Sequence, residues 1–283
     1  MKLPMKPDFT DKVAVVTGGA GVLCSAFCKA LAACGAKVAV LDLTLERAEA
    51  LAEEIRQEGG TAKGFAANVL DEESLKKTHD EIASLFGPCD ILINGAGGNN
   101  PAATSDDEFF SLDTMNDPEK ISFFDLTRAG FDKVFSLNIM GTLLPTQTFA
   151  KDMVEKEQGC IINISSMNAF TPLTKIPAYS AAKSGVSNFT QWLAVHFAKT
   201  GIRVNAIAPG FFSTAQNAAL LWNPDGSPTA RTGKILNATP MGRFGEPEEL
   251  LGALLFLCDK NSSGFITGVI LPVDGGFNAY SGV

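Results

Sequence analysis

A tyrosine and a lysine stand four residues apart in the segment Tyr179-Ser180-Ala181-Ala182-Lys183. On a helix, this spacing places both side chains on one face. A free tyrosine has a pKa of about 10, so a role as a base near neutrality needs a downward shift of about three units, or ~4 kcal/mol. The ammonium group of Lys183 favours the phenolate and supplies part of that shift. The pair therefore indicates proton transfer at Tyr179.

Two further polar residues fit the same chemistry. Ser166 follows an apolar run thirteen residues before Tyr179, where its hydroxyl can hold a substrate oxygen as negative charge develops. Asn138 follows a helical segment expected at 121–137 and can position a water molecule that connects Lys183 to solvent. The candidate catalytic residues are Asn138, Ser166, Tyr179 and Lys183.

Glycines cluster in the turn Thr17-Gly18-Gly19-Ala20-Gly21, between a β-branched run and a helical segment. Glycine lets the backbone approach a pyrophosphate, whose charge is favoured by the N-terminus of the following helix. Asp42 ends the next apolar run and can accept hydrogen bonds from ribose hydroxyls. An acid here repels a 2′-phosphate, and residues 43–45 offer no basic partner. The sequence therefore predicts NAD rather than NADP as cofactor.

These residues need a scaffold of alternating strands and helices. Apolar runs predict seven strands at 12–17, 37–41, 62–69, 90–94, 160–165, 203–208 and 268–273. Helical segments are expected at 22–34, 45–58, 72–86, 121–137, 141–157, 178–199 and 246–258. Near-continuous apolar strands that alternate with amphipathic helices are typical of a parallel sheet covered on both faces. We expect an α/β fold: a single doubly wound Rossmann-type domain over 1–283, with a seven-stranded parallel sheet.

Two stretches interrupt this alternation. Residues 98–120 are polar and rich in turns, and residues 211–240 contain the turn signal Asn223-Pro224-Asp225-Gly226. Long irregular segments in a compact domain are usually lids or binding loops. We expect an insertion at 98–120 and a substrate lid at 211–240.

Composition excludes several classes of function. The chain is 46% hydrophobic and carries a net charge of −8, which disfavours a disordered chain and the binding of nucleic acid or anionic membranes. There is no apolar run of the ~20 residues needed to span a bilayer, and no signal peptide is evident. The six cysteines lack a repeated spacing, so we expect reduced core thiols, no metal site and a cytoplasmic protein. His79 and His196 have no evident carboxylate partner, and we expect no catalytic role for them.

Taken in order along the chain, these motifs strongly resemble the short-chain dehydrogenase/reductase family. The resemblance covers about Lys12 to Gly276 and includes Asn94-Gly95-Ala96-Gly97, Pro209-Gly210 and Val273-Asp274-Gly275-Gly276. It implies that Asn138, Ser166, Tyr179 and Lys183 form the family's catalytic tetrad, and that the protein is a homotetramer built partly on helices 141–157 and 178–199. The residues that it implies for NAD binding, together with those of the glycine turn, are Thr17, Gly18, Gly19, Gly21, Val22, Leu23, Asp42, Asn68, Val69, Asn94, Ala96, Gly97, Tyr179, Lys183, Pro209, Gly210, Phe212 and Thr214.

The sequence departs from the family pattern at two places. The last two glycines of the usual turn fall at Val22 and Cys24, and Asn68-Val69 stands where many members have Asp before Val. Cys24 near a helix N-terminus can have a lowered pKa, but we expect it to fill space where the family has glycine. Asn68 can still hydrogen bond an adenine ring.

Within the family, residues 166–174 and 97–101 are similar to a sugar-acid group, the D-mannonate oxidoreductases. A sugar acid needs hydroxyl partners and a cation for its carboxylate. The candidate substrate residues are Asn99, Asn168, Lys175, Gln216 and Arg231, with Asn100 beside them. Lys175, four residues before Tyr179, is the first choice for the carboxylate, and Arg231 is the second. The alternative for each is a solvated loop residue.

The sequence thus predicts an NAD-dependent enzyme that interconverts a secondary alcohol and a ketone of a sugar acid, D-mannonate and D-fructuronate. A dehydrogenase of gluconate, 2-deoxygluconate or another polyol is the alternative within the family. An epimerase or dehydratase on the same fold would need further acid–base groups. A non-catalytic dinucleotide-binding regulator would not require the Ser166, Tyr179 and Lys183 set.

Overall fold

The computed structural model describes residues 3–213 and 221–282. One sheet runs through the molecule in the order β3-β2-β1-β4-β5-β6-β7, and all neighbouring strands are parallel. The seven-stranded parallel sheet predicted from the sequence is therefore confirmed. The strands are β1 (Val13–Thr17), β2 (Lys37–Asp42), β3 (Thr61–Ala66), β4 (Ile91–Asn94), β5 (Gly159–Ile164), β6 (Ile202–Pro209) and β7 (Ile270–Val273).

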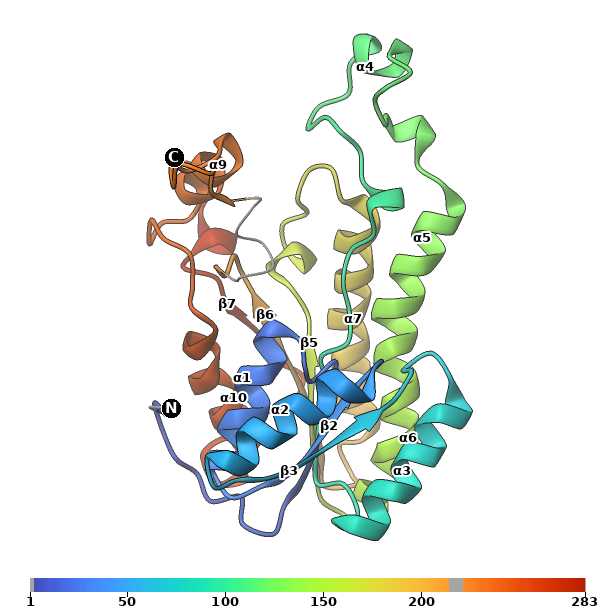
Figure 1. The fold of residues 1–283 in the computed structure, drawn as a ribbon, viewed down its shortest axis with the longest axis vertical. Coiled ribbons are helices and arrows are strands. Elements are labelled where there is room, and N and C mark those ends of the chain that lie inside the picture. The colour runs from blue at the N-terminus through green and yellow to red at the C-terminus, as the bar shows by residue number, and fades with distance from the viewer. Residues whose placement is uncertain (1–2, 214–220, 283) are drawn as a thin grey trace.

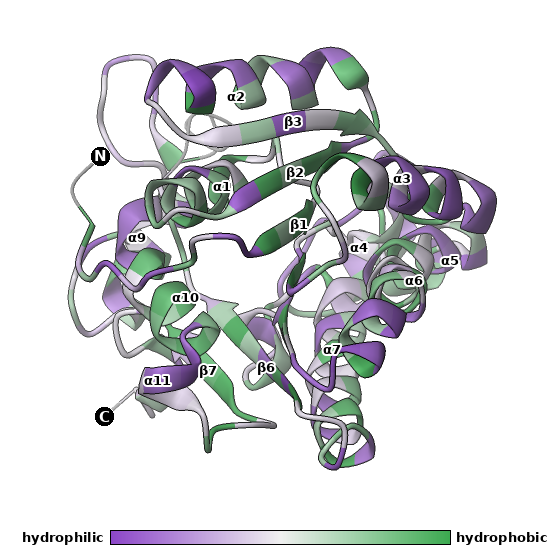
Figure 2. Ribbon diagram, turned by 90° about the horizontal axis from the view of Figure 1, so that it is seen from below, coloured by the Kyte–Doolittle hydropathy of each residue, from purple (hydrophilic) through white to green (hydrophobic). Residues whose placement is uncertain are grey.

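Helices cover both faces of the sheet (Figure 1, Figure 2). One face packs against α1 (Val22–Ala33), α2 (Leu45–Gln57) and α10 (Leu251–Cys258), and the other against α3 (Glu72–Leu85), α6 (Gly141–Glu155) and α7 (Pro177–His196). Side chains along β1 alternate between these two layers, as the two-residue period of a strand requires. Within the described residues, no helix has the length and apolar character that crossing a bilayer demands.

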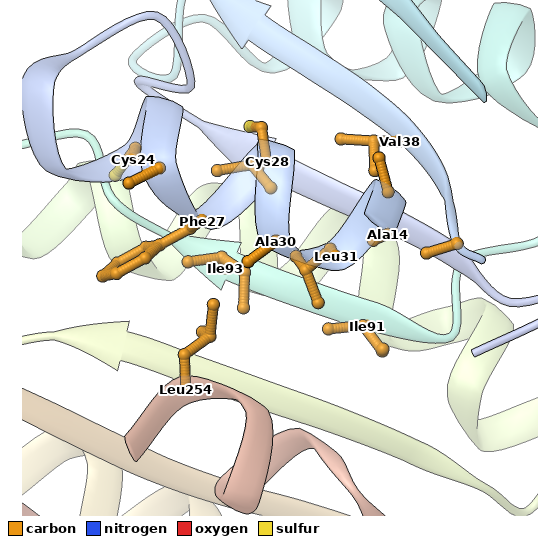
Figure 3. Packing of buried hydrophobic residues seen from close by; sticks show 14 of the residues in the cluster. Ala14, Cys24, Phe27, Cys28, Ala30, Leu31, Val38, Ile91, Ile93 and Leu254 are labelled. Atoms are coloured by element: carbon orange, nitrogen blue, oxygen red, sulfur yellow. The ribbon is translucent and has the colours of Figure 1, made fainter. Parts of the chain in front are cut away.

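Helix α1 anchors the glycine turn to the sheet (Figure 3). Phe27, Cys28 and Leu31 of this helix are fully buried and pack among Ala14, Val38, Ile91 and Ile93. Burial of a side chain as large as Phe27 or Leu31 contributes roughly 1.5–3 kcal/mol to folding. The N-terminus of α1 is thereby held at the carboxyl end of β1.

The sheet reverses its winding between β1 and β4. From β1 the chain moves outward through β2 to β3, then returns to place β4 on the other side of β1. The turns after β1 and β4 diverge at this switch point and leave a crevice at the carboxyl ends of the strands. That crevice is where the fold can hold a ligand.

The prediction of a helix at 121–137 is wrong over the first third of that range. Residues 123–125 form only a 3-10 turn, and α5 spans Arg128–Phe135. Ser122 and Thr127 accept hydrogen bonds from the backbone of Phe124 and Gly130, so each begins a new element and the helix cannot run through. A π-helical turn, Ser136–Met140, then joins α5 to α6.

The two irregular stretches contain short elements of their own. The insertion at 98–120 holds a 3-10 turn at Pro101–Ala103 and the helix α4 (Leu112–Asn116), which projects well beyond the sheet (Figure 1). The described part of 211–240 contains α9 (Ala230–Ala238). Elsewhere the strand and helix boundaries shift by a few residues from those expected, and α11 (Lys260–Ser263) follows α10.

Candidate active site

A cavity of about 630 Å³ lies at the switch point of the sheet. It brings together residues from the turns after β1, β2, β3, β4, β5 and β6 with residues of α7. The predicted residues that line it are Gly18, Gly21, Val22, Leu23, Asp42, Asn68, Val69, Ala96, Gly97, Ser166, Tyr179, Lys183, Pro209, Gly210 and Phe212. Thr214 lies outside the described residues.

Three residues expected to bind the cofactor support the cavity instead of lining it. The Thr17 hydroxyl accepts hydrogen bonds from the backbone N–H groups of Gly95 (3.1 Å) and Ala96 (3.2 Å), which ties the first turn to the fourth. Gly19 is packed so closely that an added Cβ would lie 2.9 Å from the side chain of Val40. Asn94 is buried and donates to Thr146 and Asn163, both at 2.9 Å, because its side chain points into the layer beneath the turn.

The glycine turn has the shape that a pyrophosphate needs. Gly18 has a φ of +60°, and a Cβ there would lie 3.0 Å from the Cα of Ala96. A side chain at Gly97 would lie 2.7 Å from Asn138 Oδ1 and 3.1 Å from Lys183 Nζ. The open backbone, the adjacent helix N-terminus and the acid at Asp42 together fit a dinucleotide.

Cys24 occupies space beneath this turn. Its side chain is 5% exposed, and a Cβ added at Gly95 would collide with its Sγ atom. Burial raises the pKa of the Cys24 thiol to about 12, so the lowered pKa that a helix N-terminus can produce is not realised. The packing role expected from the sequence agrees with this burial.

Asp42 has a basic partner that the sequence analysis missed. Arg47 Nη1 lies 3.3 Å from Asp42 Oδ1, and Arg47 Nη2 donates to the carbonyl of Ala20 at 3.2 Å. Residues 43–45 include no cation, but the first turn of α2 brings Arg47 back over the end of β2. Both side chains line the cavity. The charge at this end of the cavity is therefore an ion pair and not a lone carboxylate.

The catalytic candidates converge at the other end of the cavity. Tyr179 and Lys183 lie one turn apart on α7, and Lys183 Nζ is 5.7 Å from the centre of the Tyr179 ring. Ser166 begins the turn after β5 and hydrogen bonds Tyr179. Lys183 Nζ donates to the carbonyl of Ile164 at 2.7 Å, so its position is fixed by the backbone of β5.

Burial sets the protonation of this group. It lowers the pKa of Lys183 from 10.5 to about 8, which leaves the amine mostly charged at neutral pH. It also raises the pKa of Tyr179 above its ordinary value, against a smaller opposing effect of the hydrogen bond with Ser166. The protein alone therefore keeps the Tyr179 phenol protonated, and the shift toward phenolate needs a further positive charge.

Asn138 holds the loop that enters the insertion. It is fully buried in the π-helical turn, donates to the carbonyls of Gly98 and Val134 at 2.8 Å, and accepts from the Gly98 N–H at 3.2 Å. Its amide group is engaged by protein on both atoms. Asn138 therefore positions Gly97 and Gly98, while the placement of a water molecule stays a prediction.

None of the substrate candidates among the described residues lines the cavity. Asn99 is exposed and donates to Thr104, whereas Asn168 is buried with its Oδ1 atom unpartnered among the described residues. Lys175 has a φ of +72° and its charge acts on Asp107 and Glu108. Arg231 is exposed on α9, and Gln216 lies outside the described residues.

His79 has the carboxylate partners that the sequence did not reveal. Its Nε2 atom lies 2.9 Å from Asp152 on α6, and its Nδ1 atom lies 3.2 Å from Asp80. The contact with Asp152 joins α3 to α6 across 73 residues of sequence, so a local sequence pattern cannot predict it. The pair does not line the cavity, so it is a link between helices and not a part of the site.

Comparison with known proteins identifies relatives along the whole chain. Residues 12–223 match the family model described as short chain dehydrogenase. An uncharacterized oxidoreductase of Haemophilus influenzae is 59% identical over 283 residues, covering 100% of this chain and 99% of the relative. A crystal structure from the same species, named provisionally as a D-mannonate oxidoreductase with bound NAD, is 60% identical, with a TM-score of 0.95 and 98% coverage of both chains.

A more distant structural relative is named for activity on another sugar acid. It is a gluconate 5-dehydrogenase from Burkholderia cenocepacia in complex with NADP and tartrate. It is 28% identical, with a TM-score of 0.80, and the alignment covers 96% of this chain and 97% of that one.

Proposed function

The chain belongs to the short-chain dehydrogenase family, and from that premise we propose that it oxidises D-mannonate to D-fructuronate, reversibly, with NAD in preference to NADP. The membership makes it an oxidoreductase that uses a nicotinamide dinucleotide. The observation that carries the proposal is the cavity at the switch point, where Ser166, Tyr179 and Lys183 meet the glycine turn and Asp42.

The cofactor site is proposed to run along the cavity from Asp42 to Lys183. Asp42 would accept the ribose hydroxyls, the turn at Gly18 would receive the pyrophosphate, and Asn68 and Val69 would face the adenine. Pro209, Gly210 and Phe212 would border the nicotinamide. When bound, the oxidised nicotinamide accepts a hydride and carries the positive charge that the Tyr179 phenolate needs.

Tyr179 is proposed as the general base for the substrate hydroxyl. Its phenol is kept protonated by burial in the free protein, so the proton must leave before or as the alcohol reacts. Lys183, fixed by the Ile164 carbonyl, holds positive charge beside the ring throughout. Ser166 would hold the same oxygen that Tyr179 deprotonates, which stabilises its developing negative charge.

The sugar-acid substrate is supported by two observations. Residues 166–174 are similar to the D-mannonate oxidoreductases, and a structural relative that is 60% identical bears that provisional name. Lys175 is the proposed partner for the carboxylate and Arg231 the second candidate. Asn99, Asn168 and Gln216 are proposed to meet hydroxyl groups.

A gluconate-type or other polyol dehydrogenase is the second candidate. The similarity in fold to the gluconate 5-dehydrogenase favours this candidate, since gluconate and mannonate both offer a carboxylate and several hydroxyls. A non-catalytic regulator is disfavoured, because Lys183 is buried beside Tyr179 at a cost that binding alone does not require.

We also propose a cytoplasmic homotetramer. Helices α6 and α7 carry an apolar groove of about 560 Å³ on their outer side, lined by Leu143, Val154, Phe189 and Trp192. Trp192 is 55% exposed and Val195 is 79% exposed. Large apolar side chains of this kind are typical of a subunit interface.

The test is a rate measurement of NADH formation with a panel of sugar acids and polyols. We expect D-mannonate to have the highest kcat/KM, gluconate a lower one, and neutral polyols the lowest because they lack the carboxylate. A neutral polyol that outperforms every sugar acid would overturn the substrate proposal. No turnover with any member, by an enzyme that binds NAD, would favour the regulator.

A further inference from the structure

Two cysteines and a buried arginine meet at the amino-terminal edge of the sheet, far from the catalytic group. Cys160 on β5 and Arg203 on β6 are direct partners in the parallel register, so their side chains stand together on one face. Helix α10 covers that face and ends at Cys258. Both cysteines are free and buried. Three elements thus place two thiols beside one guanidinium.

Arg203 carries its charge into this cluster without an acidic partner. It is 8% exposed and donates to the carbonyls of Leu257 (2.8 Å) and Cys258 (3.3 Å) and to the Ser263 hydroxyl (3.1 Å). These carbonyls belong to the end of α10, where the helix leaves its acceptors unsatisfied. Among the described residues, no carboxylate forms an ion pair with Arg203. Its positive charge is therefore left to act on the thiols.

The two thiols have different proton affinities. Cys160 Sγ lies 3.5 Å from the Leu257 carbonyl, next in sequence to Cys258. The hydrogen bond with the Cys258 thiol and the charge of Arg203 lower the pKa of Cys160, and they outweigh the opposing effect of burial. The same contact, together with burial, raises the pKa of Cys258. Cys160 is thus the nucleophilic member of the pair, since the thiolate is the reactive form.

A cavity gives small molecules a route to the pair. About 610 Å³ of space is lined by Cys160, Cys258 and Arg203, and by Lys260 and Phe265. Phe265 is fully exposed, so the cavity reaches the surface. This space is large enough to admit hydrogen peroxide.

We propose that Cys160 and Cys258 are a peroxide-sensing thiol pair, in which Cys160 is oxidised first and Cys258 resolves it to a disulfide. The Cys160 thiolate attacks one oxygen of hydrogen peroxide; an S–O bond forms, the O–O bond breaks, and hydroxide leaves. Cys258 then attacks the sulfur of the sulfenic acid; the S–S bond forms, the S–O bond breaks, and a second hydroxide leaves. The two thiol protons convert both hydroxides to water. Two thiols are oxidised and one peroxide is reduced.

The proposal is independent of the dehydrogenase reaction, because the pair lies at the opposite end of β5 from Ser166. It is tested on the full-length reduced protein with a few equivalents of hydrogen peroxide, followed by alkylation and peptide mass mapping. We expect each chain to lose two hydrogen atoms and to yield a peptide that links Cys160 to Cys258. In Cys258→Ser, dimedone should label Cys160 as the sulfenic acid.

Cys34→Ser is the matched control, since Cys34 is a buried thiol in the same apolar layer as Cys160 and Cys258. We expect the link to persist in this variant. A link from Cys258 to Cys34, a link that survives in Cys160→Ser, or wild-type thiols that all stay reduced would each overturn the proposal. The wild-type map decides the question even where a variant fails to fold.

Discussion

The two sides of the cleft differ in how their side chains are held. The strand-end region, comprising Thr17–Leu23, Asp42 and Asn94–Gly97, is fixed by backbone and buried side chains: Thr17 and Asn94 are at most 1% exposed. The loop region, comprising 98–120 and the described residues 221–240, leaves Phe109 81% exposed and joins its parts by surface contacts. The fold therefore fixes the positions of the strand-end residues more tightly than those of the loops.

This contrast has a physical origin in the sheet. Parallel strands buried on both faces bring their carboxyl ends to one line, so turns after them have little freedom. The outer part of the insertion lies away from the sheet, and there Phe110 packs against Phe124, with ring centres 5.8 Å apart, and Phe124 packs against Phe123 at 5.5 Å. Local contacts of this kind fix a segment's own shape but leave its position weakly determined.

The largest effect is expected from Tyr179→Phe, which removes one oxygen of α7 that faces the strand-end region across the cavity. We expect kcat to fall by roughly 10²–10⁴-fold, the usual contribution of a general base. NAD affinity should stay within about 3-fold, because the ring and its packing remain. Steady-state rates and NAD titration measure the two quantities. A variant with near-normal turnover would show that Tyr179 is not the base.

The protonation of Tyr179 can be measured directly, since the chain has only two tyrosines. In a Tyr280→Phe background, absorbance titration of the free protein reports on Tyr179 alone. We expect a pKa above the ordinary tyrosine value, because burial raises it. Addition of NAD should lower it. If NAD binding leaves the pKa of Tyr179 unchanged, the charge of the cofactor does not assist the deprotonation of Tyr179.

The second effect, in order of size, concerns the ion pair at the ribose end. In Asp42→Ala we expect the ratio of kcat/KM for NAD to that for NADP to fall roughly 10–100-fold, or about 1.4–2.8 kcal/mol. Two causes contribute: the repulsion of a 2′-phosphate disappears, and Arg47 is released to attract it. In the double variant Asp42→Ala with Arg47→Ala, the second contribution should vanish. An unchanged ratio would contradict the role of Asp42 as the selector.

The sequence predicted the strand-end region better than the loop region for the same reason. Runs such as Val13–Thr17 and the turn at Gly18 are local signals, and Tyr179 and Lys183 share one helix turn. Asp152 lies 73 residues from His79, and their contact depends on how α3 and α6 pack. Arg47 is close to Asp42 in sequence, but their contact depends on the direction in which α2 leaves the end of β2. The helix expected at 121–137 failed because the caps Ser122 and Thr127 override its periodicity.

The third effect, on the free energy of unfolding, is expected at His79, which joins α3 to α6 in the helix layer on one face of the sheet. Burial alone would lower the pKa of His79, but the hydrogen bonds and charges of Asp152 and Asp80 outweigh it and raise the pKa. Because the pKa of His79 is higher in the folded protein than in the unfolded chain, protonated His79 stabilises the fold. This stabilisation is complete at pH values below the unfolded pKa of about 6.5, and it is lost as the pH rises through the folded pKa. We expect about 1 kcal/mol of unfolding free energy to disappear over that window.

Urea unfolding of wild type and His79→Gln measures this loss at pH 6, below the unfolded pKa of about 6.5, and at pH 8.5, well above it. The difference between the two proteins should be present at the lower pH and small at the higher one. Asp80→Asn is the control, and its effect should be weaker because Asp80 is 67% exposed whereas Asp152 is 12% exposed. If the difference in unfolding free energy between wild type and His79→Gln grows with pH, the pKa of His79 is lowered by folding and not raised.

The smallest effect is expected at the contact that closes the loop region. Lys234 on α9 donates to both carboxylate oxygens of Glu108 at 2.7 and 2.8 Å, and this pair joins the insertion to the described part of the lid. An exposed ion pair contributes at most about 1 kcal/mol. In Glu108→Gln we therefore expect KM for the sugar acid to rise about 2–5-fold, with kcat and NAD affinity unchanged, because the catalytic residues stay in place. The charge swap Glu108→Lys with Lys234→Glu should restore KM. Should the swap fail while Glu108→Gln raises KM, Glu108 must act on the substrate itself, and the loop region would then be as specific as the strand ends.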